Sequence, residues 1–222
     1  TLIQSSSQRV TYPGDVKIKD LNGDGVIDYG NNTLSDHGDK TVIGNSLPRF
    51  SYSLNLSGDW NNFFVSAFFQ GVGKQDWYPS SECIFWGQYN RPYNNLPEWH
   101  LGNYWTEDNT DAYLPRYAGY NSSLKSTTQT RYLQNVAYIR LKNLQFGYTL
   151  PQEIVSKAKM QNARIYISAE NLWCWSPLYK HTRDLDVTNI YGSDPDLTNG
   201  RSGDGQSYPQ MKSISLGASV TF

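Results

Sequence analysis

The last twelve residues of the chain, Met211 to Phe222, contain a strict alternation between apolar and small polar side chains. From Ile214 onward every second residue is apolar, and the residues between them are Ser, Gly or Thr. Successive side chains of a β-strand point to opposite faces, so this pattern predicts a strand with one apolar and one polar face. Such a strand has to place its apolar face against a protein core or against lipid.

Four more segments show the same two-faced pattern. The expected strands are 50–58, 63–73, 136–150, 164–173 and 214–222. In the third of them the apolar phase changes near its start, which indicates either a β-bulge near Lys142 or a portion of the strand that stands above a bilayer. The residues 152–160, between the third and fourth strands, are expected to form one or two helical turns.

The lengths of the connections alternate. Short turns join the first pair and the second pair of strands, whereas the polar segments 74–134 and 176–210 form the long connections. Outer-membrane barrels have this asymmetry, with long loops outside the cell and short turns in the periplasm. The expected fold is therefore all-β, an antiparallel transmembrane β-barrel segment with long extracellular loops. Five strands cannot close a barrel, which needs about eight, so these are expected to be the last strands of a larger one.

The composition is compatible with this fold and excludes others. Aromatic residues make up 14% of the chain and charged residues 18%, against a usual charged fraction of roughly 25%. The mean hydropathy of -0.62 and the lack of a run of ~18 apolar residues argue against a helical membrane protein. A net charge of -1 gives no reason to expect a nucleic-acid partner. The only cysteines, Cys83 and Cys174, allow one disulfide at most.

An acidic segment near the start of the chain reads Asp-Leu-Asn-Gly-Asp-Gly-Val-Ile-Asp over residues 20–28. It places oxygen donors at positions 1, 3, 5, 7 and 9 of an EF-hand-type loop, a pattern that suits Ca²⁺. Position 12 holds Asn31 instead of Glu, so Asp36 or Asp39 has to supply the missing carboxylate. The expected ligands of a structural Ca²⁺ are Asp20, Asn22, Asp24, the carbonyl of Val26, Asp28 and Asp39. The alternative is an Asx-rich turn that binds no metal.

The segment 74–134 is rich in aromatic rings interleaved with amides and carboxylates. Exposed rings in such a setting stack on sugar faces while the polar groups bind the hydroxyls. The candidates for contact with a substrate or partner are Trp77, Tyr78, Trp86 and Tyr89. The alternative is that these rings pack the segment against itself or against a partner protein.

Several short motifs, spread from residue 13 to the end of the chain, match one family in order. They are Pro13-Gly14-Asp15, the acidic segment 20–28, Thr41-Val42-Ile43-Gly44, Phe68-Phe69-Gln70-Gly71, Tyr138-Ile139-Arg140-Leu141-Lys142-Asn143-Leu144, Phe146-Gly147-Tyr148, Ala169-Glu170-Asn171-Leu172 and the terminal Phe222. Together they resemble SusC/RagA-like TonB-dependent outer-membrane transporters. The spacing between Asp28 and Asp39 is longer than the family's, which leaves the last ligand of the cation site open.

The resemblance implies a barrel of about 22 strands with an N-terminal plug, which imports oligosaccharides or peptides through the outer membrane of a Bacteroidota bacterium. It also implies a SusD-like surface lipoprotein as cap and the TonB complex as energy source. Residues 1–49 would be an extracellular loop with a cation-binding turn. Residues 50–222 would supply the C-terminal barrel strands, with extracellular loops 74–134 and 176–210.

Two other function classes compete with a transporter. A soluble β-rich carbohydrate-binding module with a structural calcium site would use the same acidic loop and rings, but it would bury its apolar strand faces. An enzyme is not expected, because His37, His100 and His181 lie in separate polar segments without metal-ligand spacing.

Overall fold

The computed structural model of the chain describes residues 3–4, 12–79, 83–89, 95–118, 128–190 and 208–222. Parts of the two long connections, residues 80–82, 90–94, 119–127 and 191–207, lie outside the described residues. Among the described residues, no helix combines the length and the apolar character needed to cross a membrane.

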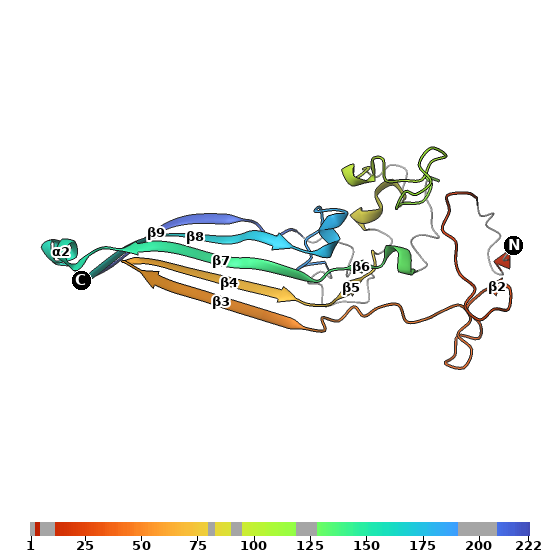
Figure 1. Cartoon of the computed structure of the whole chain (residues 1–222), viewed down its shortest axis with the longest axis horizontal. Coiled ribbons are helices and arrows are strands. Elements are labelled where there is room, and N and C mark those ends of the chain that lie inside the picture. Colours follow the sequence, from red (N-terminus) through yellow and green to blue (C-terminus); the bar gives the residue numbers. More distant parts are fainter. Residues whose placement is uncertain (1–2, 5–11, 80–82, 90–94, 119–127, 191–207) are drawn as a thin grey trace. The chain divides into compact units, whose positions relative to one another are not determined.

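The main element is a five-stranded antiparallel sheet with the strand order β3-β4-β7-β8-β9 (Figure 1). Its strands are β3 (Ser51–Trp60), β4 (Phe63–Val72), β7 (Tyr138–Thr149), β8 (Asn162–Trp175) and β9 (Ser213–Thr221). All five expected strands are therefore present, and the expected antiparallel order is confirmed. Alternating hydrophobicity located them because it depends only on the local period of two residues.

The two short connections have different structures. Asn61 and Asn62 join β3 to β4 with φ values of 47° and 68°, the left-handed conformation that two-residue hairpins of type I′ require. Between β7 and β8, the helix α2 (Gln152–Val155) is followed by the 3₁₀ turn η4 (Ser156–Ala158), as the sequence predicts.

The bulge expected near Lys142 is present. The pairing of β7 with β4 passes from Leu141 directly to Asn143, and the pairing of β7 with β8 shifts at the same place. Lys142 therefore has no partner in the ladder, which lets the apolar face continue although the sequence changes phase.

The chain divides into two compact units. The first unit comprises Thr1–Gly44 and Pro79–Leu133, and the second comprises Asn45–Tyr78 and Gln134–Phe222 with the main sheet. The residues 79–133 thus belong with the start of the chain rather than with the strands that flank them.

The described residues of the first unit include a parallel pair of short strands, β1 (Ile3–Gln4) and β2 (Val26–Ile27), and three 3₁₀ turns. The turns are η1 (Ile84–Tyr89), η2 (Glu98–His100) and η3 (Thr130–Tyr132). Asp15 and Arg116 form an ion pair with an Nε–Oδ1 distance of 2.7 Å, which connects the two segments of this unit.

The second unit has a small core beyond the main sheet. The two-residue strands β5 (Asp76–Trp77) and β6 (Gln134–Asn135) pair there, and the 3₁₀ turn η5 (Pro177–Lys180) follows β8. The buried side chains of this core are Trp77, Val136, Leu178, Leu185, Val187 and Ile190.

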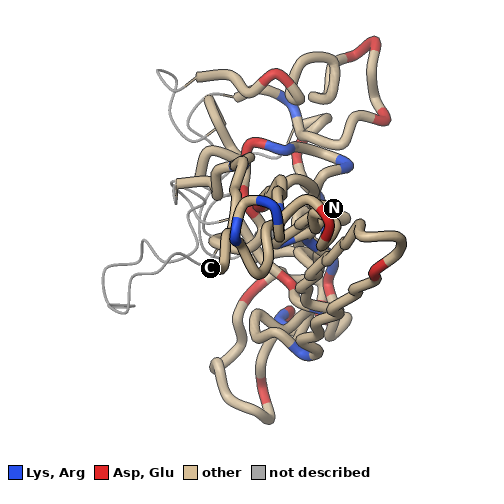
Figure 2. The backbone as a smooth tube through the Cα atoms, turned by 90° about the vertical axis from the view of Figure 1, so that its left-hand side faces the viewer, with Lys and Arg blue, Asp and Glu red and all other residues tan. Residues whose placement is uncertain are grey.

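Charged residues of both signs are scattered along the backbone between long uncharged stretches (Figure 2).

Candidate functional site: the two faces of the main sheet

The pairing register places most apolar side chains of the five strands on one face of the sheet. Each row across the sheet consists of directly paired residues, one from each strand. Three adjacent rows are Trp60, Phe63, Tyr148, Ile165 and Ala218; Gly58, Val65, Phe146, Ile167 and Leu216; and Leu56, Ala67, Leu144, Ala169 and Ile214. A one-residue slip of any strand would break these rows, so the register and the apolar face specify each other.

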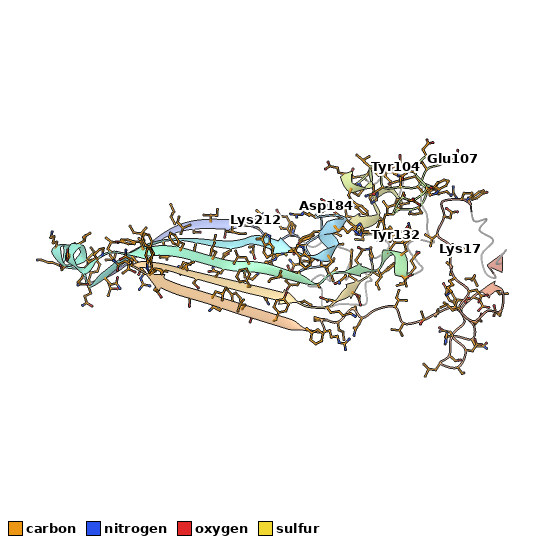
Figure 3. All side chains as sticks on the ribbon, in the orientation of Figure 1. Lys17, Tyr104, Glu107, Tyr132, Asp184 and Lys212 are labelled. Atoms are coloured by element: carbon orange, nitrogen blue, oxygen red, sulfur yellow. The ribbon has the colours of Figure 1, made fainter. Side chains whose placement is uncertain are left out.

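This apolar face is exposed, and side chains project from both faces of the sheet (Figure 3). The exposed fractions are 42% for Val65, 50% for Phe146, 46% for Ile167 and 81% for Leu216. A soluble antiparallel sheet normally buries one of its faces on a core. An apolar face of this width, left open across five strands, is a surface for lipid or for another protein.

Aromatic rings gather at both ends of the apolar face. Near the two-residue turn, Phe63 lies against Tyr148 with ring centroids 4.8 Å apart, and Trp60 is 78% exposed. At the opposite end the exposed rings are Phe50, Tyr52, Trp173 and Trp175. Rings at both borders of an apolar band are typical of proteins that cross a membrane, because these side chains favour the lipid–water boundary.

The other face of the sheet is polar. One of its rows consists of Ser57, Ser66, Gln145, Ser168 and Ser215. Small residues also admit rings on this face: a Cβ at Gly147 would lie 2.5 Å from Cζ of Phe64, and one at Gly217 would lie 2.6 Å from Cε2 of Tyr166. The sheet therefore has one face suited to lipid and one suited to water.

In the first unit, the acidic segment 20–28 is held by hydrogen bonds to its own backbone. The Asp20 carboxylate accepts from the N–H groups of Gly23 at 2.6 Å and Gly25 at 2.9 Å. Oδ1 of Asp24 accepts from the N–H of Val26 at 2.8 Å. These carboxylates therefore shape the loop as they would in an Asx-rich turn.

Asp39 is the carboxylate that returns to this segment. It accepts from the N–H of Leu21 at 2.6 Å and from the N–H of Asp28 at 2.9 Å, and these donors hold its pKa below the usual value. Asp36 instead binds the backbone and side-chain amides of Asn31. Among the described residues, no three acidic, His or Cys side chains are grouped closely enough to hold a metal. Calcium binding at this loop stays a prediction.

The rings expected to contact a substrate or partner are largely buried. Trp77 is 2% exposed, Trp86 and Tyr89 are fully buried, and Tyr78 is half-buried. Trp86 donates through Nε1 to the carbonyl of Pro79 at 3.1 Å, and its ring meets that of Tyr132 edge-on. Trp77, Trp86 and Tyr89 have no face left for a ligand, because they pack inside the protein, as in the alternative interpretation of these rings.

Trp86 and Tyr89 belong to what we call the ring cluster of the first unit. Its members are Phe85, Trp86, Tyr89, Trp99, His100, Tyr117 and Tyr132. His100 is fully buried in it, and its Nε2 lies 2.9 Å from the carbonyl of Phe85. Burial lowers the pKa of His100 to about 4, so the imidazole is neutral at pH 7.

The remaining candidates from the sequence are the cysteines and the histidines. Cys83 is buried and Cys174 is half-buried, and the disulfide that two cysteines allow is not formed. His37 contacts the carbonyl of Gly38 in the acidic loop, far along the chain from His100. Sequence reasoning missed a different group, in which Arg140 on β7 binds Asp186 and Gln210. Only the unusual pair of basic residues in a barrel-like strand, Arg140 and Lys142, signals it in the sequence.

Comparison with known proteins gives relatives over nearly the whole chain. TonB-dependent receptor P3 of Formosa agariphila is 29% identical over 221 residues, which are 95% of this chain and 19% of that protein. TonB-dependent receptor P26 of the same organism is 28% identical over 219 residues, 94% of this chain and 20% of that protein. The chain therefore spans about a fifth of the length of these curated relatives. No family model matches it.

Solved structures agree with these relatives. A structure of the RagAB peptide transporter matches 76% of this chain and 16% of its own with a TM-score of 0.50 and 25% identity. The RagAB peptide importer in its closed-closed state matches 82% of this chain and 18% of its own with a TM-score of 0.55 and 23% identity, which is a likeness of fold. The family resemblance that the motifs indicate is confirmed.

Proposed function

We infer that this chain, a relative of TonB-dependent receptors, contributes five transmembrane strands and their outer loops to the barrel of an outer-membrane transporter. The barrel would have about 22 strands in all. The apolar face of the sheet would contact lipid, and the polar face would line the lumen.

The observation that carries this proposal is the exposed apolar face with rings at both ends. The ten residues of β3, Ser51–Trp60, rise about 34 Å along the strand. At a strand tilt of about 40° this corresponds to about 26 Å along the barrel axis, and the apolar band of an outer-membrane barrel is about 25 Å tall. The strands are therefore long enough to cross the membrane once each.

The proposed cargo is a nutrient oligosaccharide or peptide, brought in with a SusD-like surface lipoprotein and driven by the TonB complex. Support comes from the relatives, which are TonB-dependent receptors and a peptide transporter by name. The parts of the chain that would meet the cargo or the lipoprotein are the loops 74–134 and 176–210. We assign no catalytic role to any residue.

The soluble carbohydrate-binding module is not favoured. Such a module would have to bury Leu216, Phe146 and their neighbours on a core, because folding of a soluble domain depends on removing apolar surface from water. These side chains are exposed in the sheet instead.

We also propose that the acidic loop binds a structural Ca²⁺. Asp39 is hydrogen-bonded to Leu21 and Asp28 of the segment, so it is the carboxylate available to replace the Glu that position 12 of the EF-hand-type pattern lacks. The carboxylate oxygens that accept one N–H each retain a second lone pair for a cation. The ion would then tie residue 39 to residues 20–28 more firmly than the hydrogen bonds do alone.

Orientation in the membrane gives the sharpest test of the transport proposal. A site for a specific protease is inserted into the full-length protein after Glu107, in an exposed turn of the loop 74–134. The matched control carries the same site after Lys157, in the exposed turn between β7 and β8. We expect both variants in the outer-membrane fraction, with cleavage on intact cells after Glu107 and not after Lys157.

Other results would count against the proposal. Recovery of the wild-type protein in the soluble fraction would exclude a barrel. Outer-membrane recovery in which intact cells are cleaved after Lys157 and not after Glu107 would show that the loops face the opposite side.

A further inference from the structure

The polar face of the sheet holds a buried ion pair near the end from which the long loops leave. Arg140 on β7 is 4% exposed and pairs through Nη2 with Oδ1 of Asp186 at 2.5 Å. In the register Arg140 stands beside Gln70 on β4 and Cys174 on β8, so it belongs to the polar face. A buried charge of this kind is tolerated only when its partners are fixed.

The partners of Arg140 come from both ends of the connection between β8 and β9. Nη1 of Arg140 and Nζ of Lys142 both donate to Oε1 of Gln210, at 3.1 and 3.0 Å. The backbone N–H of Gln210 in turn donates to Oδ2 of Asp186 at 2.9 Å. Thr188 donates to the other carboxylate oxygen through its N–H and its hydroxyl. The start and the end of this connection are therefore both fixed to Arg140, and the end is bonded to Lys142 as well.

The start of the connection also packs on itself. Leu178, Leu185, Val187 and Ile190 are each at most 2% exposed. Tyr179 lies over the polar face, where its hydroxyl donates to Sγ of Cys174 at 3.7 Å. In Figure 1 this segment, coloured blue, turns back beside the ends of β7 and β8.

We propose that Arg140 and Lys142 form a latch that folds the base of the β8–β9 loop, residues 176–190 and 208–210, inward over the polar face. The latch rests on the proposed function for its consequence: in a barrel, the polar face lines the lumen, so the folded base narrows the lumen at its outer entrance. Asp186 and Gln210 are then positioning residues for a constriction that cargo has to pass. The role of Arg140 and Lys142 is to hold the base of the β8–β9 loop in this position.

The thiol of Cys174 is a native reporter of the latch, because Tyr179 of the loop base lies against it. The full-length protein is purified in detergent, treated with a maleimide, and the modified peptides are quantified by mass spectrometry. Asp186→Asn removes the charge that pairs with Arg140 without touching Cys174. The matched control is Asp184→Asn, a loss of the same charge from an exposed residue of the same loop, whose side chain is bonded to Thr182. Cys83, which is buried in the other unit, reports general unfolding.

We expect Asp186→Asn to raise the modification rate of Cys174 about tenfold, as local opening of the loop base becomes more frequent. The rate for Asp184→Asn stays within about twofold of the wild type, and Cys83 stays protected in both. An unchanged Cys174 rate in Asp186→Asn would overturn the latch. A parallel rise for Cys83 would overturn it as well, because the ion pair would then act on the whole fold.

Gln210→Ala is a second, milder variant, since it leaves the ion pair in place. It should raise the Cys174 rate by a smaller factor in the same direction, and no rise would contradict the role of Gln210. On intact cells, an impermeant maleimide should reach Cys174 in Asp186→Asn from outside; labelling only after lysis would overturn the constriction at the outer entrance. Absence of the wild-type protein from the outer membrane would instead refute the proposed function, while the detergent result would still decide the latch.

Discussion

Acidification should open the ring cluster of the first unit, because its buried histidine has to remain neutral. Nε2 of His100 donates to the carbonyl of Phe85, and the hydroxyl of Tyr117 lies 3.4 Å from Nδ1. Burial raises the pKa of Tyr117 to about 12, so that neighbour stays neutral and gives no compensating charge. Burial lowers the pKa of His100 from 6.5 to about 4, and only the hydrogen bond to Phe85 opposes this shift.

The direction in which stability changes with pH follows from the lowered pKa of His100. The unfolded segment takes up a proton near pH 6.5, whereas the folded one resists protonation until about pH 4. The stabilisation by neutral His100 is therefore complete above pH 6.5 and declines as the pH falls toward 4. The total loss in folding free energy is about 3 kcal/mol, because each unit of pKa difference corresponds to about 1.36 kcal/mol. At pH 5 the loss is about 2 kcal/mol, which is about a thirtyfold rise in the open population.

Modification of Cys83 measures this opening, since its buried thiol precedes Phe85 by two residues. A disulfide reagent that reacts at low pH is applied to the purified full-length protein between pH 7.5 and 5, with rates corrected for thiol ionisation. His100→Gln is the matched variant, because its amide can still donate to the carbonyl of Phe85 but does not titrate. We expect about a thirtyfold rise for the wild type and a flat profile for the variant. Equal slopes for both proteins would refute the assignment to His100.

Three further predictions concern the sheet and the acidic loop. Gly147→Ala should lower the free energy of unfolding by about 1–3 kcal/mol. The reason is that the new Cβ would lie 2.5 Å from the ring of Phe64 and 2.7 Å from the carbonyl of Ile165. The measurement is the folded fraction seen in a gel mobility assay. Gly58→Ala, whose Cβ would meet its nearest atom at 4.0 Å, should match the wild type, and equal loss in both would contradict this reasoning. Leu216→Arg should lower the free energy of unfolding, measured by urea titration in lipid vesicles, by about 2–4 kcal/mol. Ser215→Arg on the polar face should lower it much less. The reverse order would show that the two faces are assigned wrongly. Calcium should raise the protease resistance of the acidic loop in the wild type and should have no such effect in Asp24→Asn. If the protease resistance of the wild type is the same with calcium and with a chelator, the loop is a turn that binds no metal.

The sequence reveals the strands more readily than the arrangement of the loops. Each strand was found from the alternation along its own few residues, and even the bulge at Lys142 shows as a change of apolar phase. The rings of segment 74–134 were harder to interpret, because a tyrosine or tryptophan among polar residues suits a binding surface and a small core equally well. Only packing distinguishes the two, and it buries Trp86 and Tyr89.

The sequence by itself determined the two-faced sheet, its connections and its family resemblance, because side-chain alternation is a property of neighbouring residues. The tertiary structure decided which distant groups meet. Asp186 and Gln210 lie 46 and 70 positions from Arg140 in the chain, yet they bind the same guanidinium. Asp39 returns across 18 positions to the N–H of Leu21, whereas Asp36 does not return to that segment. Such contacts depend on how the loops close in space, and no local period in the sequence records that closure.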